Sequence, residues 1–347
     1  MKRVTLGGSD VEVSEICLGT MTFGNQTPEP EGHAQMDRAL DAGITFMDTA
    51  EMYPVNPVRR ETIGLTETIL GNWLARSGNR DRVEIATKIT GPSQMVRDNA
   101  PYDGAIVAKA IDASLKRLQT DRIDLYQMHW PVRGSYAFRQ NWTYDPSKQS
   151  KQRTLDHMAD VLGALSDARK AGKIRAFGLS NESAWGTLRW IDTAERLGGP
   201  RVVSVQNEYS LLHRLYDTDM AEVAANEKVT LLAYSPLAAA TLTGKYLDGR
   251  IPPGTRRALD HRKSRYDKVN ADAAVRAYLE VSKRHGLDPA QMALAFVTRQ
   301  PFVTSNIIGA TSMEHLKTNI DSIGITLGEE VLKEIEEVND RFPNPCP

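Results

Sequence analysis

The chain has 347 residues, 41% hydrophobic and 25% charged, with 43 basic and 44 acidic side chains and a formal net charge of −1. This composition is typical of a globular protein with a sizeable core, and its charge balance argues against nucleic acid or an anionic membrane surface as a partner. No apolar run approaches the roughly 20 residues that cross a bilayer, and the N-terminus lacks the apolar core of a signal peptide. The two cysteines, Cys17 and Cys346, indicate neither a disulfide framework nor a metal site. We therefore expect a cytoplasmic protein.

The predicted elements begin with a β-hairpin, which residues 2–6 and 11–14 form around a Gly-Gly-Ser-Asp turn. After it, short apolar or β-branched runs alternate with segments that have a helical pattern. The predicted strands are residues 16–20, 44–49, 83–89, 123–130, 174–181, 202–209, 229–236 and 305–311. The predicted helices are residues 31–43, 61–78, 103–119, 155–172, 182–198, 217–228, 271–286, 288–300, 312–323 and 327–342.

This alternation predicts a parallel sheet with helices outside it. Eight strands favour closure into a (β/α)8 TIM barrel over an open doubly wound sheet, and no break in the pattern resembles a domain linker. The chain also has no G-x-G-x-x-G fingerprint after its first strand and no Walker A motif, so an open nucleotide-binding sheet loses its usual support. We therefore expect one domain over residues 1–347, an α/β TIM barrel with an N-terminal hairpin and extra C-terminal helices.

Two segments are long enough to be functional loops, residues 131–153 and residues 237–270. The first can wall a substrate pocket with aromatic surface, or it can be a solvated insertion whose aromatic side chains anchor it to the barrel. Both interpretations stay open at this point. The aromatic residues of this loop are Tyr136, Phe138, Trp142 and Tyr144.

Polar residues follow the ends of the early predicted strands: Asp48, Tyr53, Lys88 and His129. The C-terminal ends of barrel strands all face one mouth, so we expect these side chains to meet there. Each has a structural explanation when taken alone, such as a turn cap for Asp48, and the prediction depends on all of them occurring together. An acid, a phenol, an amine and an imidazole at one place predict a proton-transfer site.

The chemistry of such a site suits a carbonyl group. Tyrosine has a reference pKa of about 10, and a nearby lysine ammonium favours the phenolate and so makes the phenol a better acid. An aspartate keeps the lysine charged, and a histidine can hydrogen-bond and orient a carbonyl oxygen. Together these groups can protonate an oxygen as a hydride reaches its carbon, and the hydride must come from a cofactor.

Motifs along the whole chain resemble the aldo-keto reductases. They begin with MDTAEMY (47–53), ATK (86–88) and LYQMHWP (125–131), in this order. Further motifs are GLSN (178–181), VQNEYS (205–210), AYSPL (233–237), LTGKY (242–246) and IIGATSMEHLKTN (307–319). The EMYP loop, GLTET, SLKRLQTD and GLDPAQMALAFV resemble especially the bacterial Tas-like branch of that family.

The resemblance implies an NADPH-dependent oxidoreductase that reduces aldehydes or ketones. It makes Tyr53 the general acid/base, Lys88 the residue that tunes the Tyr53 pKa, Asp48 the partner of Lys88, and His129 the group that orients the carbonyl. The partner is then a small-molecule carbonyl substrate, whose identity is not readable from the sequence. The oligomeric state is not readable either, so a homo-oligomer stays open.

The resemblance also implies the cofactor contacts. On the nicotinamide side, Ser180, Asn181 and Gln206 hold the carboxamide, and Tyr234 stacks on the ring. The remaining implied contacts are Ser235 and Leu237 at the pyrophosphate, Lys245 and Arg256 at the adenosine phosphate, Gly309 and Thr311 with backbone N–H groups on anionic oxygen, and His315 and Asn319 on the adenosine side.

Two departures from the family pattern fall in the adenosine region, where His315 replaces Arg or Gln and Thr318 replaces Glu. They weaken the preference for NADPH over NADH, although Lys245 and Arg256 still favour a ribose that carries a 2′-phosphate. The alternative for these two cations is that they are ordinary surface charges in a polar loop.

Two other functions compete with carbonyl reduction. The family includes potassium-channel β-subunits, which bind the cofactor and act as regulatory partners, but channel-type relatives commonly lack the histidine that stands here as His129. A barrel enzyme with a Schiff base on Lys88, of the aldolase type, is the third possibility. A neighbouring Asp48 argues against it, because a carboxylate stabilises the ammonium form of the lysine.

Overall fold

A closed barrel of parallel strands forms the centre of the protein, as the sequence predicts. The computed structural model describes residues 1–138, 140–259 and 264–346. In the barrel the order is β10-β3-β4-β5-β6-β7-β8-β9, so the last strand pairs with both the first and the last but one. The strands are β3 (Ile16–Gly19), β4 (Phe46–Asp48), β5 (Glu84–Ile89), β6 (Ile123–Met128), β7 (Ile174–Ser180), β8 (Val202–Glu208), β9 (Thr230–Tyr234) and β10 (Val303–Ile308).

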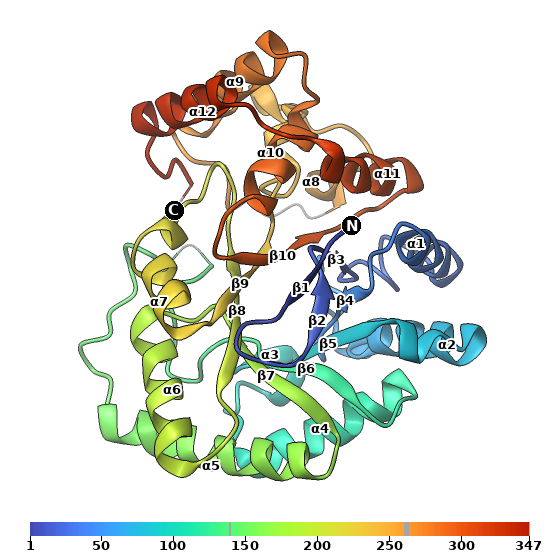
Figure 1. Ribbon diagram of the computed structural model, residues 1–347, viewed down its shortest axis with the longest axis vertical. Coiled ribbons are helices and arrows are strands. Elements are labelled where there is room, and N and C mark those ends of the chain that lie inside the picture. The colour runs from blue at the N-terminus through green and yellow to red at the C-terminus, as the bar shows by residue number, and fades with distance from the viewer. Residues whose placement is uncertain (139, 260–263, 347) are drawn as a thin grey trace.

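Helices surround the barrel, and Figure 1 shows them outside the ring of strands. Those that follow the strands in turn are α1 (Glu29–Asp41), α2 (Leu65–Ser77), α4 (Gly104–Leu118), α5 (Lys151–Lys170), α6 (Ala184–Leu197), α7 (Asp219–Glu227), α10 (Pro289–Thr298) and α11 (Met313–Asp321). The additional helices are α3 (Gln94–Arg97), α8 (Arg256–Leu259), α9 (Ala271–Arg284) and α12 (Glu329–Arg341). α9 and α12 pack on each other beside the barrel, where they form the extra C-terminal layer. No helix in the described ranges is long and apolar enough to span a membrane.

Each barrel strand buries both of its faces, and successive side chains alternate between the interior of the barrel and the surrounding helices. In β6, Leu125 belongs to the cluster inside the barrel, whereas Tyr126 and Met128 belong to the cluster between the strands and the helices. This alternation matters below, because it assigns each side chain near the end of a strand to one side of the barrel wall.

The predicted N-terminal hairpin closes one end of the barrel. Strands β1 (Arg3–Thr5) and β2 (Glu12–Ser14) pair antiparallel, and Figure 1 shows them across the middle of the ring. Leu6, Val11 and Val13 pack on interior side chains of the barrel strands, including Phe46 and Leu125. The interior is therefore filled from this end, and the opposite end remains for a site.

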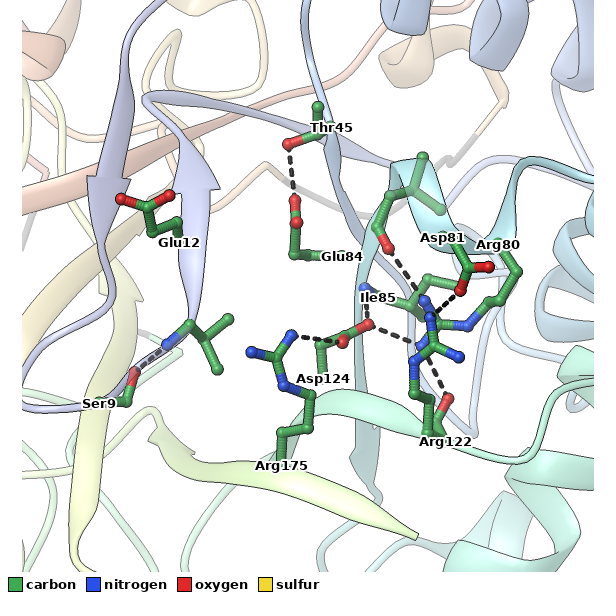
Figure 2. Close-up of polar contacts among 12 residues, drawn as sticks. Ser9, Glu12, Thr45, Arg80, Asp81, Glu84, Ile85, Arg122, Asp124 and Arg175 are labelled. Atoms are coloured by element: carbon green, nitrogen blue, oxygen red, sulfur yellow. Dashed lines mark hydrogen bonds and ion pairs between the residues drawn. The ribbon is translucent and has the colours of Figure 1, made fainter. Parts of the chain in front are cut away.

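Ion pairs stabilise the barrel at the end that the hairpin closes. Figure 2 shows the buried carboxylate of Asp124, which accepts hydrogen bonds from Arg80 (2.7 Å), from Arg175 (3.1 Å) and from the backbone N–H of Ile85 (2.9 Å). This is the N-terminal end of the strands, where side chains of such barrels contribute to stability and not to catalysis.

Several predicted boundaries differ from the observed ones, and two of the differences have clear local reasons. The helix predicted for residues 61–78 begins only at Leu65, because Gly64 has φ of 79°, in the left-handed region that ends the separate 3-10 turn at Arg60–Thr62. The loop predicted for residues 131–153 ends at Ser150, whose hydroxyl accepts a hydrogen bond from the backbone N–H of Arg153 and so caps α5.

Candidate active site

The predicted proton-transfer residues lie together at the C-terminal mouth of the barrel. Asp48 ends β4, Lys88 lies in β5, His129 directly follows β6, and Tyr53 lies in the loop after β4. Lys88 Nζ is 2.6 Å from Asp48 Oδ2 and 5.0 Å from the centre of the Tyr53 ring. The Tyr53 and His129 rings meet edge to face, with centroids 5.7 Å apart.

Lys88 is the most enclosed charge of the site, with 0% of its surface exposed. Its ammonium donates hydrogen bonds to Asp48 Oδ2 and to the backbone carbonyl oxygen of Thr49 (2.8 Å). Burial disfavours the charged form, but the charge and hydrogen bond of Asp48, together with the phenolate form of Tyr53, outweigh burial, so the pKa of Lys88 lies above its ordinary value. The side chain therefore stays protonated.

Asp48 is held from both sides. While Oδ2 faces Lys88, Oδ1 accepts hydrogen bonds from Gln206 Nε2 (2.9 Å) and from Gln127 Nε2 (3.2 Å). Gln127 was missed by the sequence analysis. The alternation of β6 carries the signal for it, because Gln127 stands two residues after the interior residue Leu125.

Tyr53 is almost fully enclosed, with 9% of its surface exposed. Burial raises the pKa of Tyr53 above the ordinary value, and the nearby charge of Lys88 opposes this increase. Arg256 lies close enough for its charge to lower the pKa of Tyr53 as well. The segment that carries α8 therefore comes within electrostatic range of the phenol.

His129 is neutral in this environment. Burial first, and then the Lys88 charge, lower the pKa of His129 well below its ordinary value. Its Nδ1 is buried and has no hydrogen-bond partner within the described residues. Its backbone is anchored, because its N–H donates to the carbonyl oxygen of Ile89 (3.0 Å) and its carbonyl oxygen accepts from Asn181 Nδ2 (2.9 Å). A neutral imidazole can donate one N–H to an oxygen in the mouth.

The residues predicted for the nicotinamide carboxamide also lie at this mouth and are linked to one another. Asn181 Nδ2 donates to Ser180 Oγ (3.0 Å) as well as to His129, and Asn181 Oδ1 accepts from the Tyr234 hydroxyl (2.7 Å). Ser180 Oγ donates to the backbone carbonyl oxygen of Gln206 (2.8 Å). One network therefore joins the ends of β6, β7, β8 and β9.

The loop after β9 carries the predicted phosphate contacts. Ser235 Oγ accepts a hydrogen bond from Arg265 (2.9 Å), whose guanidinium also stands 5.7 Å from the centre of the Tyr234 ring. Arg265 was missed by the sequence analysis, because nothing in its local pattern distinguishes it from the other arginines of this loop. Leu237 packs on the main core, and Lys245 Nζ lies 5.3 Å from the centre of the Tyr246 ring.

The predicted residues of the last barrel unit lie at the turn between β10 and α11. Asn319 is buried and donates from Nδ2 to the carbonyl oxygen of Gly309 (3.0 Å), so its amide holds this turn together. Thr311 Oγ1 lies 3.4 Å from His315 Nδ1, and both side chains are at the surface. Ser312 caps α11 by accepting from the backbone N–H of His315 (3.2 Å).

The aromatic loop after β6 is a pocket wall in one part and a solvated insertion in another, so each of the two interpretations that the sequence left open holds for part of it. Phe138 meets the edge of Trp130, with ring centroids 6.1 Å apart, and Trp130 in turn lies against His129. Tyr136 lines a small cavity together with Tyr234. Trp142 is 80% exposed and is not among the described residues that line this cavity. The first part of the loop therefore borders the mouth, and its middle is a solvated insertion.

Comparison with known proteins shows which family the chain belongs to. The model of the family described as "Aldo/keto reductase family" matches residues 15–340. Protein tas of Escherichia coli is 49% identical over 346 residues, which cover 98% of each chain. The uncharacterized oxidoreductase YrpG of Bacillus subtilis is 33% identical over 99% of this chain and 97% of its own, and norsolorinic acid reductase stcV of Emericella nidulans is 27% identical over 96% and 80%. The chain belongs to the aldo/keto reductase family of oxidoreductases.

Proposed function

We propose that the protein is an NADPH-dependent oxidoreductase that reduces aldehydes or ketones to alcohols, with Tyr53 as the general acid. The observation that supports this most strongly is the buried pair of Lys88 and Asp48 beside Tyr53, with a neutral His129 against the same ring. These side chains are the candidates for the proton chemistry, because they are the titratable groups that meet at the mouth.

Each of these residues has a separate task in the proposal. The raised pKa of Tyr53, which burial causes, keeps the phenol protonated at neutral pH, so it has a proton to donate. The Lys88 ammonium stabilises the phenolate that forms when the proton leaves, and Asp48 keeps that ammonium charged and in position. His129 donates its N–H to the carbonyl oxygen and orients the carbonyl group.

A hydride and a proton together convert the carbonyl group into an alcohol. When bound, a reduced nicotinamide supplies the hydride, which no side chain can donate. As the carbonyl carbon gains the hydride, the carbonyl oxygen takes the proton of Tyr53 and becomes the hydroxyl of the alcohol. The phenolate of Tyr53 remains beside the Lys88 ammonium until it regains a proton from solvent.

The hydrogen-bond inventory of the mouth fits a nicotinamide carboxamide. Both Nδ2 hydrogens of Asn181 and both Nε2 hydrogens of Gln206 are already donated to protein groups. Asn181 Oδ1 retains one lone pair, and Gln206 Oε1 accepts from none of the described residues. These two oxygens would hold the amide N–H2 of the carboxamide, with Tyr234 beside its ring.

The backbone after β9 fits a pyrophosphate. Ser235 and Ala238, Ala239 and Ala240 have φ of 56°, 49°, 53° and 68°. Non-glycine residues in this left-handed region are strained, and such strain is typical of ligand clamps. Successive backbone N–H groups in turns of this kind bind anions. We therefore assign the pyrophosphate to this loop, next to the half-buried cation Arg265.

The choice of NADPH over NADH depends on the cations of the same loop. Lys245 pairs with no carboxylate among the described residues, and burial lowers the pKa of Lys245. A partly buried cation without a counter-ion suits the 2′-phosphate that distinguishes NADPH. Arg256, in the same loop, would be the second cation of this phosphate site.

The proposal also includes the number of domains, the kind of substrate and the cellular compartment of the enzyme. The family model spans residues 15–340 without a break, which supports one domain and a small-molecule carbonyl as the substrate. We also place the enzyme in a reducing compartment such as the cytoplasm, because the chain has only two cysteines, Cys17 and Cys346, and both are buried.

The test is the replacement Tyr53→Phe, measured as NADPH oxidation against a panel of aldehydes, ketones and dicarbonyls. We expect kcat to fall by about a hundredfold or more, the usual contribution of a general acid, with the Kd of NADPH changed less than about twofold. Tyr278→Phe is the matched control, because Tyr278 is a buried tyrosine of α9 whose hydroxyl has no hydrogen-bond partner within the described residues. Near-normal turnover of the Tyr53→Phe enzyme would falsify the assigned mechanism.

A further inference from the structure

A cavity of about 460 Å³ lies between the ends of strands β6 and β7, helices α5 and α6, and the segment 101–103 that precedes α4. Its barrel side is formed by Met128 and Leu179, and its helix side by Met158 and Trp190. All of these side chains are almost fully buried, with 1–3% of their surface exposed. The volume lies within the range of roughly 300–1,000 Å³ that small-molecule sites occupy, and a mainly apolar lining is typical of such sites.

The alternation of the strands separates this cavity from the mouth. Gln127 points into the barrel, where it bonds Asp48, so the next side chain, Met128, points outward to the helices. Leu179 likewise belongs to the outer cluster. None of the catalytic candidates lines the cavity, although Ser180, at the end of β7, both lines it and belongs to the network of the mouth.

The rim of the cavity carries an excess of positive charge. Its cations are Arg133, Lys148 and Arg153, and its carboxylates are Glu182 and Asp103, which leaves one positive charge. Arg133 and Glu182 neutralise each other in a two-pronged pair.

The other charged rim residues differ in whether they have partners. Asp103 is engaged as the cap of α4, where it accepts from the backbone N–H of Ile106 (2.8 Å). Lys148 and Arg153 are exposed, and neither forms an ion pair with any of the described residues. Arg153 lies in the first turn of α5, a helix of 20 residues whose N-terminal end adds a partial positive charge. An apolar floor under two unpaired cations matches a molecule with an apolar body and an anionic end.

We propose that this cavity is a second ligand site, distinct from the mouth, for a small molecule with an apolar body and a single carboxylate. The apolar body lies against Met128, Leu179 and Trp190, and the carboxylate is bound by Arg153 and Lys148 at the start of α5. The site does not depend on the proposed carbonyl reduction, since none of these side chains takes part in it.

The test uses octanoate as the probe and isothermal titration calorimetry on the full-length protein. Octanoate should bind with one-to-one stoichiometry, octan-1-ol should bind more weakly, and acetate, which has no apolar body, should give no measurable binding. Arg153→Glu should weaken octanoate binding by about tenfold or more, the value of a charge-assisted hydrogen bond. Lys151→Glu is the matched control, because Lys151 is in the same helical turn but does not line the cavity, and it should change the Kd less than about twofold.

Two further variants locate the bound probe. Thr154→Trp places an indole in the cavity and should abolish binding, and Tyr53→Phe, in the mouth, should leave binding unchanged. If Thr154→Trp does not fold, the surface variant Arg153→Glu still decides the matter. The proposal is overturned if octanoate does not bind, if Arg153→Glu binds it as tightly as Lys151→Glu does, or if Tyr53→Phe abolishes the binding.

Discussion

The sharpest prediction concerns Lys88→Met, which removes the buried ammonium and keeps a side chain of similar length. Lys88 Nζ lies 5.0 Å from the centre of the Tyr53 ring and is completely buried. At that distance, with an effective dielectric constant of about 20, a unit charge favours the phenolate by about 3 kcal/mol, or about a hundredfold in the ionisation equilibrium. The variant also leaves the carboxylate of Asp48 without its cation, which disfavours the phenolate further.

The assay is kcat/KM for carbonyl reduction as a function of pH. Tyr53 donates a proton in this direction, so activity is lost as the pH rises through the pKa of Tyr53. Removing the Lys88 charge raises the pKa of Tyr53, so the alkaline limb moves to higher pH. On the acidic side of this limb, the plateau value of kcat/KM should fall by between about tenfold and about a hundredfold, because a weaker acid transfers its proton more slowly.

A double variant separates charge from misfolding. In Lys88→Met with Asp48→Asn the carboxylate charge that raises the pKa of Tyr53 is also gone, so the alkaline limb should return part of the way toward its original position. Lys109→Met, at an exposed lysine of α4, should leave the profile unchanged. A Lys88→Met enzyme whose limb and plateau match those of the original protein would refute the electrostatic role of Lys88.

The remaining predictions test stability, histidine charge and cofactor choice. Asp124→Ala leaves Arg80 and Arg175 without their shared carboxylate and should lower the free energy of unfolding in urea by about 3 kcal/mol. The active site lies at the other end of the barrel, so kcat should not change. A loss below about 1 kcal/mol, as at an exposed ion pair, would contradict this prediction. Burial holds the pKa of His129 well below its ordinary value, so kcat/KM for reduction should show no acidic limb between about pH 5 and 8. An acidic limb in that range that disappears in the His129→Gln variant would count against a neutral imidazole. Arg256→Ala should raise the KM for NADPH by about tenfold and that for NADH less than about twofold, and equal effects on both would exclude a 2′-phosphate contact.

The fold and the family could be predicted from the sequence because both depend on short local patterns in a constant order. Buried parallel strands appear in the sequence as apolar runs, and the polar residue that ends each run lies at the mouth of the barrel. Asp48, Lys88 and His129 are such residues, so their convergence followed from the barrel alone. Tyr53 was harder, since its place depends on the path of a loop, and only its position in the motif MDTAEMY pointed to it.

Residues that act through tertiary contacts could not be predicted in this way. Arg265 donates a hydrogen bond to Ser235, which stands 30 residues earlier in the sequence, and no periodicity records a contact of that kind. Gln127 is a different case, because its inward position follows from the alternation of β6 once one interior residue of that strand is known. The same rule assigns Met128 to the outer side, where it lines the cavity that we propose as a second site. Two adjacent residues of one strand thus lead to two different sites, and the barrel wall between them makes separate ligands for these sites physically possible.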